Sequence, residues 1–248
     1  PRSQVQFDSL DTIKGVKDPS ERIRQLVSSD DRAGQFAWKC LSAVMNYAAA
    51  RSPEIADDLV GSLANGRVIR LTPNQGPAIA QNAGAEAATM PAVKFLDGDD
   101  LLAPDCILRM LPGLDLPGVG LVHGGGVLLE DLSADLGVER AGKPPRFEVM
   151  EKPLFYAVRH SFAGASALLV DKEAYLACGG CDPTVFTQEN SLVYRMGINH
   201  AFAFTQDVIL FSPPRDFRTK IGGHLGDDTR QGEHDRNAAL YGLLRNFP

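Results

Sequence analysis

The sequence has few cysteines, little aromatic content and no long apolar run. Its 4 cysteines include one Cys-Gly-Gly-Cys, Cys178 to Cys181. A structural zinc site needs a second such pair, so we interpret these residues as two thiols in a glycine turn. No segment approaches the roughly 20 apolar residues of a membrane-spanning helix, and the first residues lack the apolar core of a signal peptide. We therefore expect a cytoplasmic protein with no integral membrane segment.

The chain also lacks an excess of positive charge. Its formal net charge is -6, which argues against general affinity for nucleic acid or for an anionic membrane. A phosphate-bearing ligand would have to be bound locally, by a metal ion, a helix N-terminus or a few placed cations. Hydrophobic residues make up 44% of the 248 residues, so the chain is able to form a sizeable core.

Strand-like and helix-like segments alternate along the chain, which favours βαβ units. We expect one α/β domain over residues 1–248, with a mainly parallel central sheet flanked by helices. In particular, a helix at 77–89 should connect parallel strands at 68–71 and 92–96, and 32–50 should form another helix. Further strands are expected at 119–129, 165–170 and 201–211, and further helices at 103–111, 172–177 and 189–198.

The segment after the apolar run Ala-Val-Lys-Phe-Leu is Asp97-Gly98-Asp99-Asp100, and Pro104 follows. In an extended backbone, residues i and i+2 point the same way, so Asp97 and Asp99 can offer oxygens to one cation while Gly98 keeps the approach open. Mg²⁺ and Mn²⁺ prefer such oxygen ligands. The alternative is an acidic turn in which Asp100 caps a short helix beginning at the next residue.

A glycine turn and a helix come before this acidic strand. Asn74 and Gly76 precede Pro77, a residue suited to the first helical position, and Asn82 falls on the second turn of that helix. This pattern alone is also typical of an ordinary turn and helix start.

In their order, these two motifs resemble the family 2 glycosyltransferases, nucleotide-sugar enzymes with the GT-A fold. The family pattern is Asn-x-Gly-x-x-x-Ala-Arg-Asn, a helix, and a strand ending in Asp-x-Asp-Asp before a proline. The chain departs from it at Gln81, which replaces the arginine. The residues that match with the family spacing are Asn74, Gly76, Ala80, Asn82, Asp97, Asp99, Asp100 and Pro104.

A second, more degenerate block extends the resemblance to about residue 211. The sequence Gly-Gly-Cys-Asp, residues 179–182, follows the family's Gly-Gly-Phe-Asp, with Cys181 in place of the aromatic residue. Anchoring on Arg195 aligns Glu189 with the aspartate that acts as general base in inverting members. Ser191 replaces a further aspartate. The alternative for Glu189 is a helix-start acid stabilised by the helix dipole.

The resemblance implies a single GT-A domain, with a nucleotide-binding half at 1–130 and an acceptor half with a C-terminal lid segment at 131–248. It implies transfer of a sugar, with inversion, from a nucleotide sugar, most often a UDP-sugar, to an acceptor hydroxyl of unknown identity. Asn74, Gly76 and Asn82, with residues 97–99, would hold the donor. Mn²⁺ or Mg²⁺ would be bound by Asp97 and Asp99. His224 would add a metal ligand, or is simply a loop histidine facing solvent.

Three alternatives stay open. The first is a degenerate GT-A domain that binds UDP or a nucleotide sugar without transfer, which the changes at Gln81 and Ser191 favour. The second is a lipase-type hydrolase with Ser166 as nucleophile and residues 123–126, His-Gly-Gly-Gly, as oxyanion loop. The third is an Asp-x-Asp phosphatase, whose motif would belong on the first strand of the fold.

Overall fold

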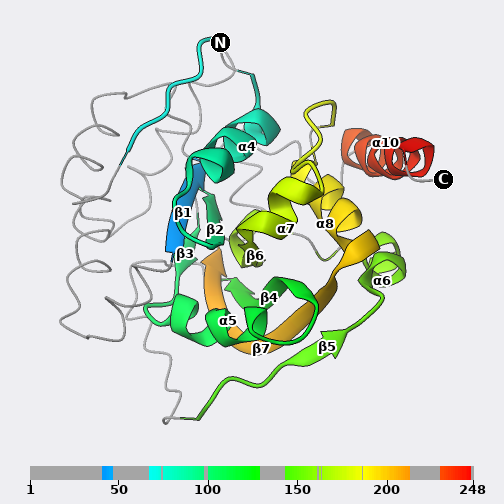
Figure 1. The fold of residues 1–248 in the computed structure, drawn as a ribbon. Helices are drawn as coiled ribbons and strands as arrows, with labels where there is room; N and C mark the ends of the chain where they lie inside the picture. Colours follow the sequence, from blue (N-terminus) through cyan, green and yellow to red (C-terminus); the bar gives the residue numbers. More distant parts are fainter. Residues whose placement is uncertain are drawn as a thin grey trace.

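A central β-sheet with helices packed against it organises the protein (Figure 1). The computed structural model describes residues 41–46, 67–73, 75–97, 100–128, 143–160, 162, 164–185, 187–212 and 230–246. The α/β class predicted from the sequence is confirmed. The described helices are α4 (Pro77–Ala87), α5 (Cys106–Leu114), α6 (Pro153–His160), α7 (Lys172–Ala177), α8 (Gln188–Asn199) and α10 (Arg230–Asn246), with a 3-10 turn at Ala165–Ala167.

The described strands form a mixed sheet. Among the described strands, β1–β2 and β4–β7 pair in parallel, whereas β2–β6, β4–β6, β3–β7 and β5–β7 are antiparallel. Apolar runs show where strands lie but carry no information about strand direction. The order is β1-β2-β6-β4-β7-β3, with β5 on β7. The strands are β1 (Leu41–Asn46), β2 (Ala92–Asp97), β3 (Leu101–Leu102), β4 (Val119–Leu128), β5 (Glu148–Met150), β6 (Leu168–Asp171) and β7 (Ala201–Ser212).

Strand β1 corrects the prediction for the first part of the chain. The sequence predicted a helix at 32–50 and a strand at 68–71. Instead, Leu41–Asn46 is a strand that pairs in parallel with β2, from Leu41↔Ala92 to Asn46↔Asp97. Residues 67–71 form no strand. A short apolar run fits either secondary structure, and the partner strand decides between them. Among the described elements, helix α4 lies between the parallel strands β1 and β2 in the sequence.

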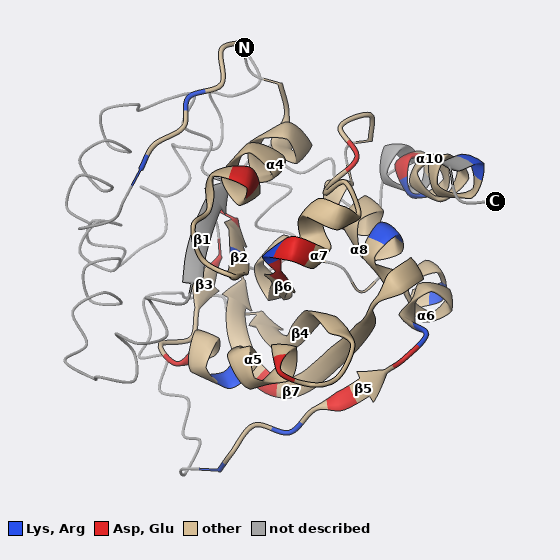
Figure 2. Cartoon of the chain, in the orientation of Figure 1, with Lys and Arg blue, Asp and Glu red and all other residues tan. Residues whose placement is uncertain are grey.

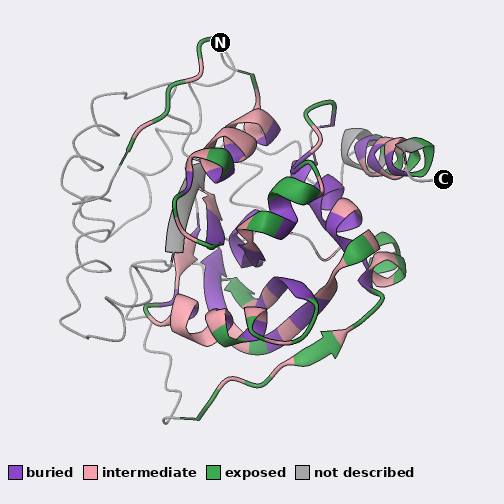
Figure 3. Cartoon of the chain, in the orientation of Figure 1, coloured by how far each residue is buried: buried purple, intermediate pink, exposed green. Residues whose placement is uncertain are grey.

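The sheet is covered on both faces, and each face has its own core. Successive strand residues alternate between the two cores, as the pleat requires. On β6, for example, Leu168 and Val170 join the core that α4, α7, α8 and α10 cover, whereas Leu169 joins the core that α5 covers. Figure 3 shows the buried residues concentrated on the central strands and on the helix faces toward them. The strands of the sheet are therefore held in place by packing on both faces.

The sheet curls where β4 and β7 continue beyond β6. Strand β6 contacts β4 only opposite residues 121–123, but the β4–β7 pairing continues to Leu128↔Ser212. Glycines in β4 allow the close approach, since a Cβ on Gly124 would overlap the Ile209 side chain. Strand β3 pairs with the end of β7, Leu101↔Phe211. The ends of β2 and β7 are thus connected through the short segment after Asp97.

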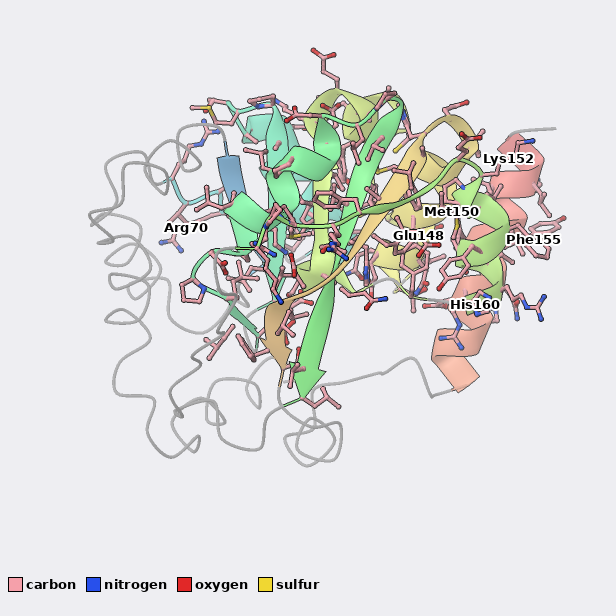
Figure 4. The ribbon with its side chains drawn as sticks, turned by 90° about the horizontal axis from the view of Figure 1, so that it is seen from below. Arg70, Glu148, Met150, Lys152, Phe155 and His160 are labelled. Carbon is pink, nitrogen blue, oxygen red and sulfur yellow. The ribbon has the colours of Figure 1, made fainter. Side chains whose placement is uncertain are left out.

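The edge formed by β5 and α6 lies on the opposite side of the molecule from Arg70. Figure 4 shows Glu148 and Met150 of β5 and Phe155 of α6 along this edge. Lysines and arginines are scattered over the described elements, with acidic residues between them (Figure 2). Among the described helices, none is long and apolar enough to cross a membrane.

Candidate functional site

Asp97 is the last residue of β2 and lies at the carboxyl end of that strand, as the sequence predicted. Its backbone N–H donates a hydrogen bond of 2.8 Å to the hydroxyl of Ser166. Ser166 belongs to the 3-10 turn that leads into β6. The strand is buried from Ala92 to Phe95 and becomes half-buried at Asp97. The backbone under this carboxylate is therefore fixed by a neighbouring element.

Asp100 has a different environment from Asp97. It is buried, at 9% exposure, and its carboxylate accepts a hydrogen bond of 2.6 Å from the hydroxyl of Ser212 at the end of β7. Its backbone N–H donates to the carbonyl of Asp97, 3.2 Å away. The alternative in which Asp100 caps a helix is wrong, because Leu101–Leu102 form strand β3. Asp100 instead ties the segment after β2 to β7.

Several residues of the predicted donor and metal site lie outside the described residues. These are Asn74, Gly98, Asp99 and His224, and their roles stay predictions. So does the division into halves at residue 130. Within the ranges that the structure describes, no three or more histidine, cysteine, aspartate or glutamate side chains gather as they would around a metal ion. Asp97 is the part of the predicted metal site that the structure places.

The predicted turn at Gly76 and helix at Asn82 are both present. Gly76 has φ 89°, a backbone conformation that favours glycine, and precedes Pro77 at the start of α4. The side chain of Asn82 donates to the carbonyl of Cys181 and accepts from its N–H, each at 2.9 Å. It also accepts from the hydroxyl of Tyr175 at 2.5 Å. Asn82 therefore holds the loop at 179–182, and a contact with nucleotide stays a prediction.

Glu189 lies in the first turn of α8 and is half-buried. Its negative charge interacts with the thiol of Cys181. Burial, with a smaller contribution from the charge of Glu189, raises the pKa of that thiol to about 12, against the hydrogen bond from Tyr175. The fold thus brings Asn82 and Glu189, which are far apart in the sequence, to the same loop.

The loop at 179–182 is held in place by α8. Arg195 forms an ion pair of 2.8 Å with Asp182 and donates to the carbonyls of Gly179 and Gly180. The hydroxyl of Ser191 accepts from the Asp182 N–H at 2.8 Å. The serine that departs from the family pattern therefore has a structural role. Within the described part of the chain, Cys106, Cys178 and Cys181 are free thiols, which fits the interpretation as a glycine turn.

Lys94 is the polar residue at this site that sequence reasoning missed. It lies on β2 and is fully buried, at 0% exposure. Its ammonium group donates to the backbone carbonyl of Ser166, and to that of Phe95 at 3.3 Å. Burial lowers its pKa to about 8, although the charges of Asp100 and Asp97 act in the opposite direction. The available signal was a lysine inside an otherwise apolar strand.

The geometry leaves the hydrolase alternative without a nucleophile. Ser166 is 1% exposed, and its hydroxyl accepts the N–H of Asp97. The ring of His123 is 3.1 Å from the carbonyl of Phe162 and packs edge-on against the Phe162 ring. The glycines that follow His123 make room for β7. This glycine run therefore has a packing explanation.

Comparison with known proteins agrees with the resemblance seen in the sequence. Residues 44–142 match the family model described as Glycosyl transferase family 2. This segment contains the turn at Gly76, helix α4 and Asp97. A separate match is 34% identical over 58 residues to the probable 3-hydroxyacyl-CoA dehydrogenase of Bacillus subtilis (strain 168). That match spans 23% of this chain and only 7% of that protein's length, so it indicates nothing about activity.

The fold is shared with crystal structures of TarS from S. aureus. The structure of TarS residues 1–349 aligns with a TM-score of 0.53 and 13% identity, over 92% of this chain and 70% of that chain. The structure of the same TarS segment in complex with UDP aligns with a TM-score of 0.50 and 12% identity, over 82% and 60%. At this level of identity the two alignments show a shared fold, and the expectation of such an α/β fold is confirmed.

Proposed function

We propose that this protein transfers a sugar from a nucleotide sugar to an acceptor hydroxyl, because the chain is similar to family 2 glycosyltransferases in both sequence and fold. The observation that carries the proposal is the position of Asp97 at the carboxyl end of β2, inside the segment that matches the family. In open α/β sheets, ligands bind at such strand ends. The UDP in the TarS complex supports a UDP-sugar as the donor.

The proposal includes a divalent cation, Mn²⁺ or Mg²⁺, held by Asp97 and Asp99 with His224 as a further ligand. Carboxylate oxygens are the ligands these ions prefer, and Asp97 is half-buried at a strand end, so its chemistry fits. When bound, the ion would act as a Lewis acid that stabilises the charge gained by the leaving diphosphate. Asp100 is not assigned as a ligand, because its carboxylate accepts from Ser212.

Glu189 is the proposed general base. A carboxylate in the first turn of α8 would take the proton of the acceptor hydroxyl as that oxygen forms a bond to the anomeric carbon. The bond from the anomeric carbon to the diphosphate breaks on the opposite face, so the configuration inverts. Asn82 and Arg195 support this role indirectly, because both hold the loop of Cys181, the residue whose thiol interacts with the charge of Glu189.

A domain that binds a nucleotide sugar without transfer is the second candidate. Two departures from the family pattern favour it. Gln81 replaces the arginine of α4, and the hydroxyl of Ser191 is used to hold Asp182 rather than to approach a ligand. The two candidates differ in turnover and agree in binding.

A melting-shift screen followed by an assay of turnover tests both candidates. UDP, UDP-glucose, UDP-galactose and the two N-acetyl sugars would be added with and without Mn²⁺. A ligand that binds only the native state raises stability by RT ln(1 + [L]/Kd), so a metal-dependent shift is expected with at least one of them. Release of UDP from the sugar that binds would establish transfer or hydrolysis. Binding without release would favour the second candidate, and no shift with any nucleotide would reject both.

A further inference from the structure

A fully buried lysine lies under the strand end that carries Asp97. Residues of β2 alternate between the two faces of the sheet, and Lys94 lies on the face covered by α5, where its neighbours Ala92 and Cys106 are buried at 2% and 3% exposure. Burying an ammonium group away from water costs several kcal/mol unless other groups compensate. A plain apolar residue at this position would avoid that cost. The groups that offset the cost of burying this ammonium therefore indicate the role of Lys94.

One hydrogen bond of Lys94 connects it, through Ser166, to the backbone of Asp97. The ammonium group donates to the carbonyl of Ser166. The hydroxyl of the same serine accepts the N–H of Asp97 at 2.8 Å. Ser166 thus connects the two residues, and Lys94 holds the turn at Ala165–Ala167 against the end of β2.

The acidic groups that interact with Lys94 are Cys106 of α5, Asp100 after β2 and Asp97 at the end of β2. Asp97 and Asp100 both favour the protonated lysine, whereas burial opposes it, and the pKa of about 8 leaves most of the lysine charged at neutral pH. Electrostatic interactions are reciprocal, so the lysine charge also lowers the energy of the two carboxylates. The same charge repels any cation placed beside them.

We propose that Lys94 is a positioning residue of the proposed metal site: it fixes the turn of Ser166 under Asp97, and its charge weakens binding of a free divalent cation at Asp97. This inference rests on the proposed function. A nucleoside diphosphate brings negative charge that offsets the lysine. The site should therefore take up metal together with nucleotide and bind metal alone weakly.

The test compares Mn²⁺ binding, with and without UDP, in the full chain and in variants. Free Mn²⁺ would be measured by electron paramagnetic resonance. Lys94→Met keeps the length of the side chain and removes its charge. We expect it to bind Mn²⁺ without UDP at least threefold more tightly than the unmodified chain does. We also expect UDP to improve Mn²⁺ affinity by a smaller factor in the variant.

Lys172→Met is the matched control. The ammonium group of Lys172 also donates to backbone carbonyls, those of Ala88 and Glu86. However, Lys172 lies at the other end of β2, where its N–H donates to the carbonyl of Pro91. Removing its charge should leave Mn²⁺ affinity unchanged. An equal gain in both variants would indicate a general charge effect and overturn the proposal.

The other outcomes also separate the possibilities. A folded Lys94→Met variant whose affinity for Mn²⁺ is unchanged or weaker overturns this inference alone. If the unmodified chain binds no Mn²⁺ even with UDP, the proposed metal site itself is wrong. If Lys94→Met does not fold, Lys94→Met/Asp100→Asn removes both buried charges and is compared with Asp100→Asn, where the same threefold gain is expected. Failure of that double variant to fold would assign Lys94 to core stability and overturn its role in metal binding.

Discussion

The thiol of Cys181 donates a hydrogen bond to the side-chain oxygen of Gln81, 3.2 Å away. These residues occupy two of the positions at which the chain departs from the family pattern. Both are buried, at 0% and 1% exposure. The two departures therefore meet in space although 100 residues separate them. A small thiol in place of an aromatic ring leaves room for the glutamine, so the two changes fit each other.

Restoring the aromatic residue alone should destabilise the protein. Cys181→Phe would insert a ring where Gln81 and Tyr175 already contact the sulfur, and overpacking typically costs about 1–3 kcal/mol. In Gln81→Ala/Cys181→Phe the shortened side chain makes room, so the loss should be less than the sum of the two single losses. Urea denaturation measures each unfolding free energy. Leu176→Phe, at a position 43% exposed, is the control. Additive losses would contradict this reading of the contact.

Asn82→Ala should reduce stability through the loop at 179–182. It removes both hydrogen bonds to the backbone of Cys181 and the one from Tyr175. Leaving a buried group unpaired costs about 1–3 kcal/mol, and the hydroxyl of Tyr175 keeps its bond to the Cys181 sulfur. The two backbone groups of Cys181 therefore set the expected loss at about 2–6 kcal/mol in urea denaturation. Asn82→Asp keeps the acceptor oxygen and should lose less. If stability is unchanged but UDP affinity falls, the role of Asn82 is in ligand binding instead.

Asp99→Asn should weaken the binding of UDP in the presence of Mn²⁺. The variant removes one charged oxygen ligand from the proposed metal site, and a tenfold loss of affinity corresponds to about 1.4 kcal/mol. Calorimetry with and without Mn²⁺ measures the effect. Asp105→Asn, at the N-terminal end of α5, serves as a control for the loss of one carboxylate. A UDP affinity that is independent of metal and unchanged in Asp99→Asn would rule out this metal site.

Glu189→Gln should separate binding from transfer. If Glu189 is the base, the amide cannot take the proton of the acceptor, and transfer should fall by a factor of about 10² or more. UDP affinity should stay the same because the proposed metal site is intact. Glu173→Gln, in the first turn of α7, is a matched helix-start control. A Glu189→Gln variant with normal transfer would assign Glu189 to the helix start alone.

His123 should make stability fall as the solution becomes acidic. Burial, the largest effect, lowers its pKa to about 4, and the charge of Lys94 adds to this against the hydrogen bond to Phe162. The unfolded chain takes up a proton near pH 6.5, and the folded protein does so only near pH 4. Between these values protonation favours unfolding, by about 2 kcal/mol from pH 7 to pH 5. Urea denaturation at several pH values should show a smaller loss in His123→Gln than in the unmodified chain.

Sequence patterns predicted the elements whose signals are local. Helix α4 was expected at 77–89 and is observed at Pro77–Ala87, because Gly76 and Pro77 mark its start. Strand β2 and helix α8 were found from apolar patterns of the correct period. These elements carry Asn82, Asp97 and Glu189, so most of the candidate site that the structure places was anticipated.

The remaining features depend on contacts between distant segments. Nothing in Leu41–Asn46 alone distinguishes a strand from part of a helix, and its pairing with β2 decides the matter. The direction of strand β6 and the burial of Lys94 are likewise decided by contacts with segments that are distant in the sequence. The partner of Lys94 is Ser166, which is 72 residues away in the sequence. A residue's own sequence neighbours do not contain that information.

The curl of the sheet brings the ends of β2 and β3 close enough for a short connection. Strands β2 and β3 are separated by β6, β4 and β7 in the sheet order, so a flat sheet would place them about 19 Å apart at about 4.8 Å per strand. The four steps from Asp97 to Leu101 reach at most about 14 Å. The N–H of Asp100 donates to the carbonyl of Asp97, and an inserted residue between them should break this bond, which joins the end of β2 to the start of β3. The folded state should therefore tolerate an exchange of side chains between Asp97 and Asp100 better than a change in the number of residues.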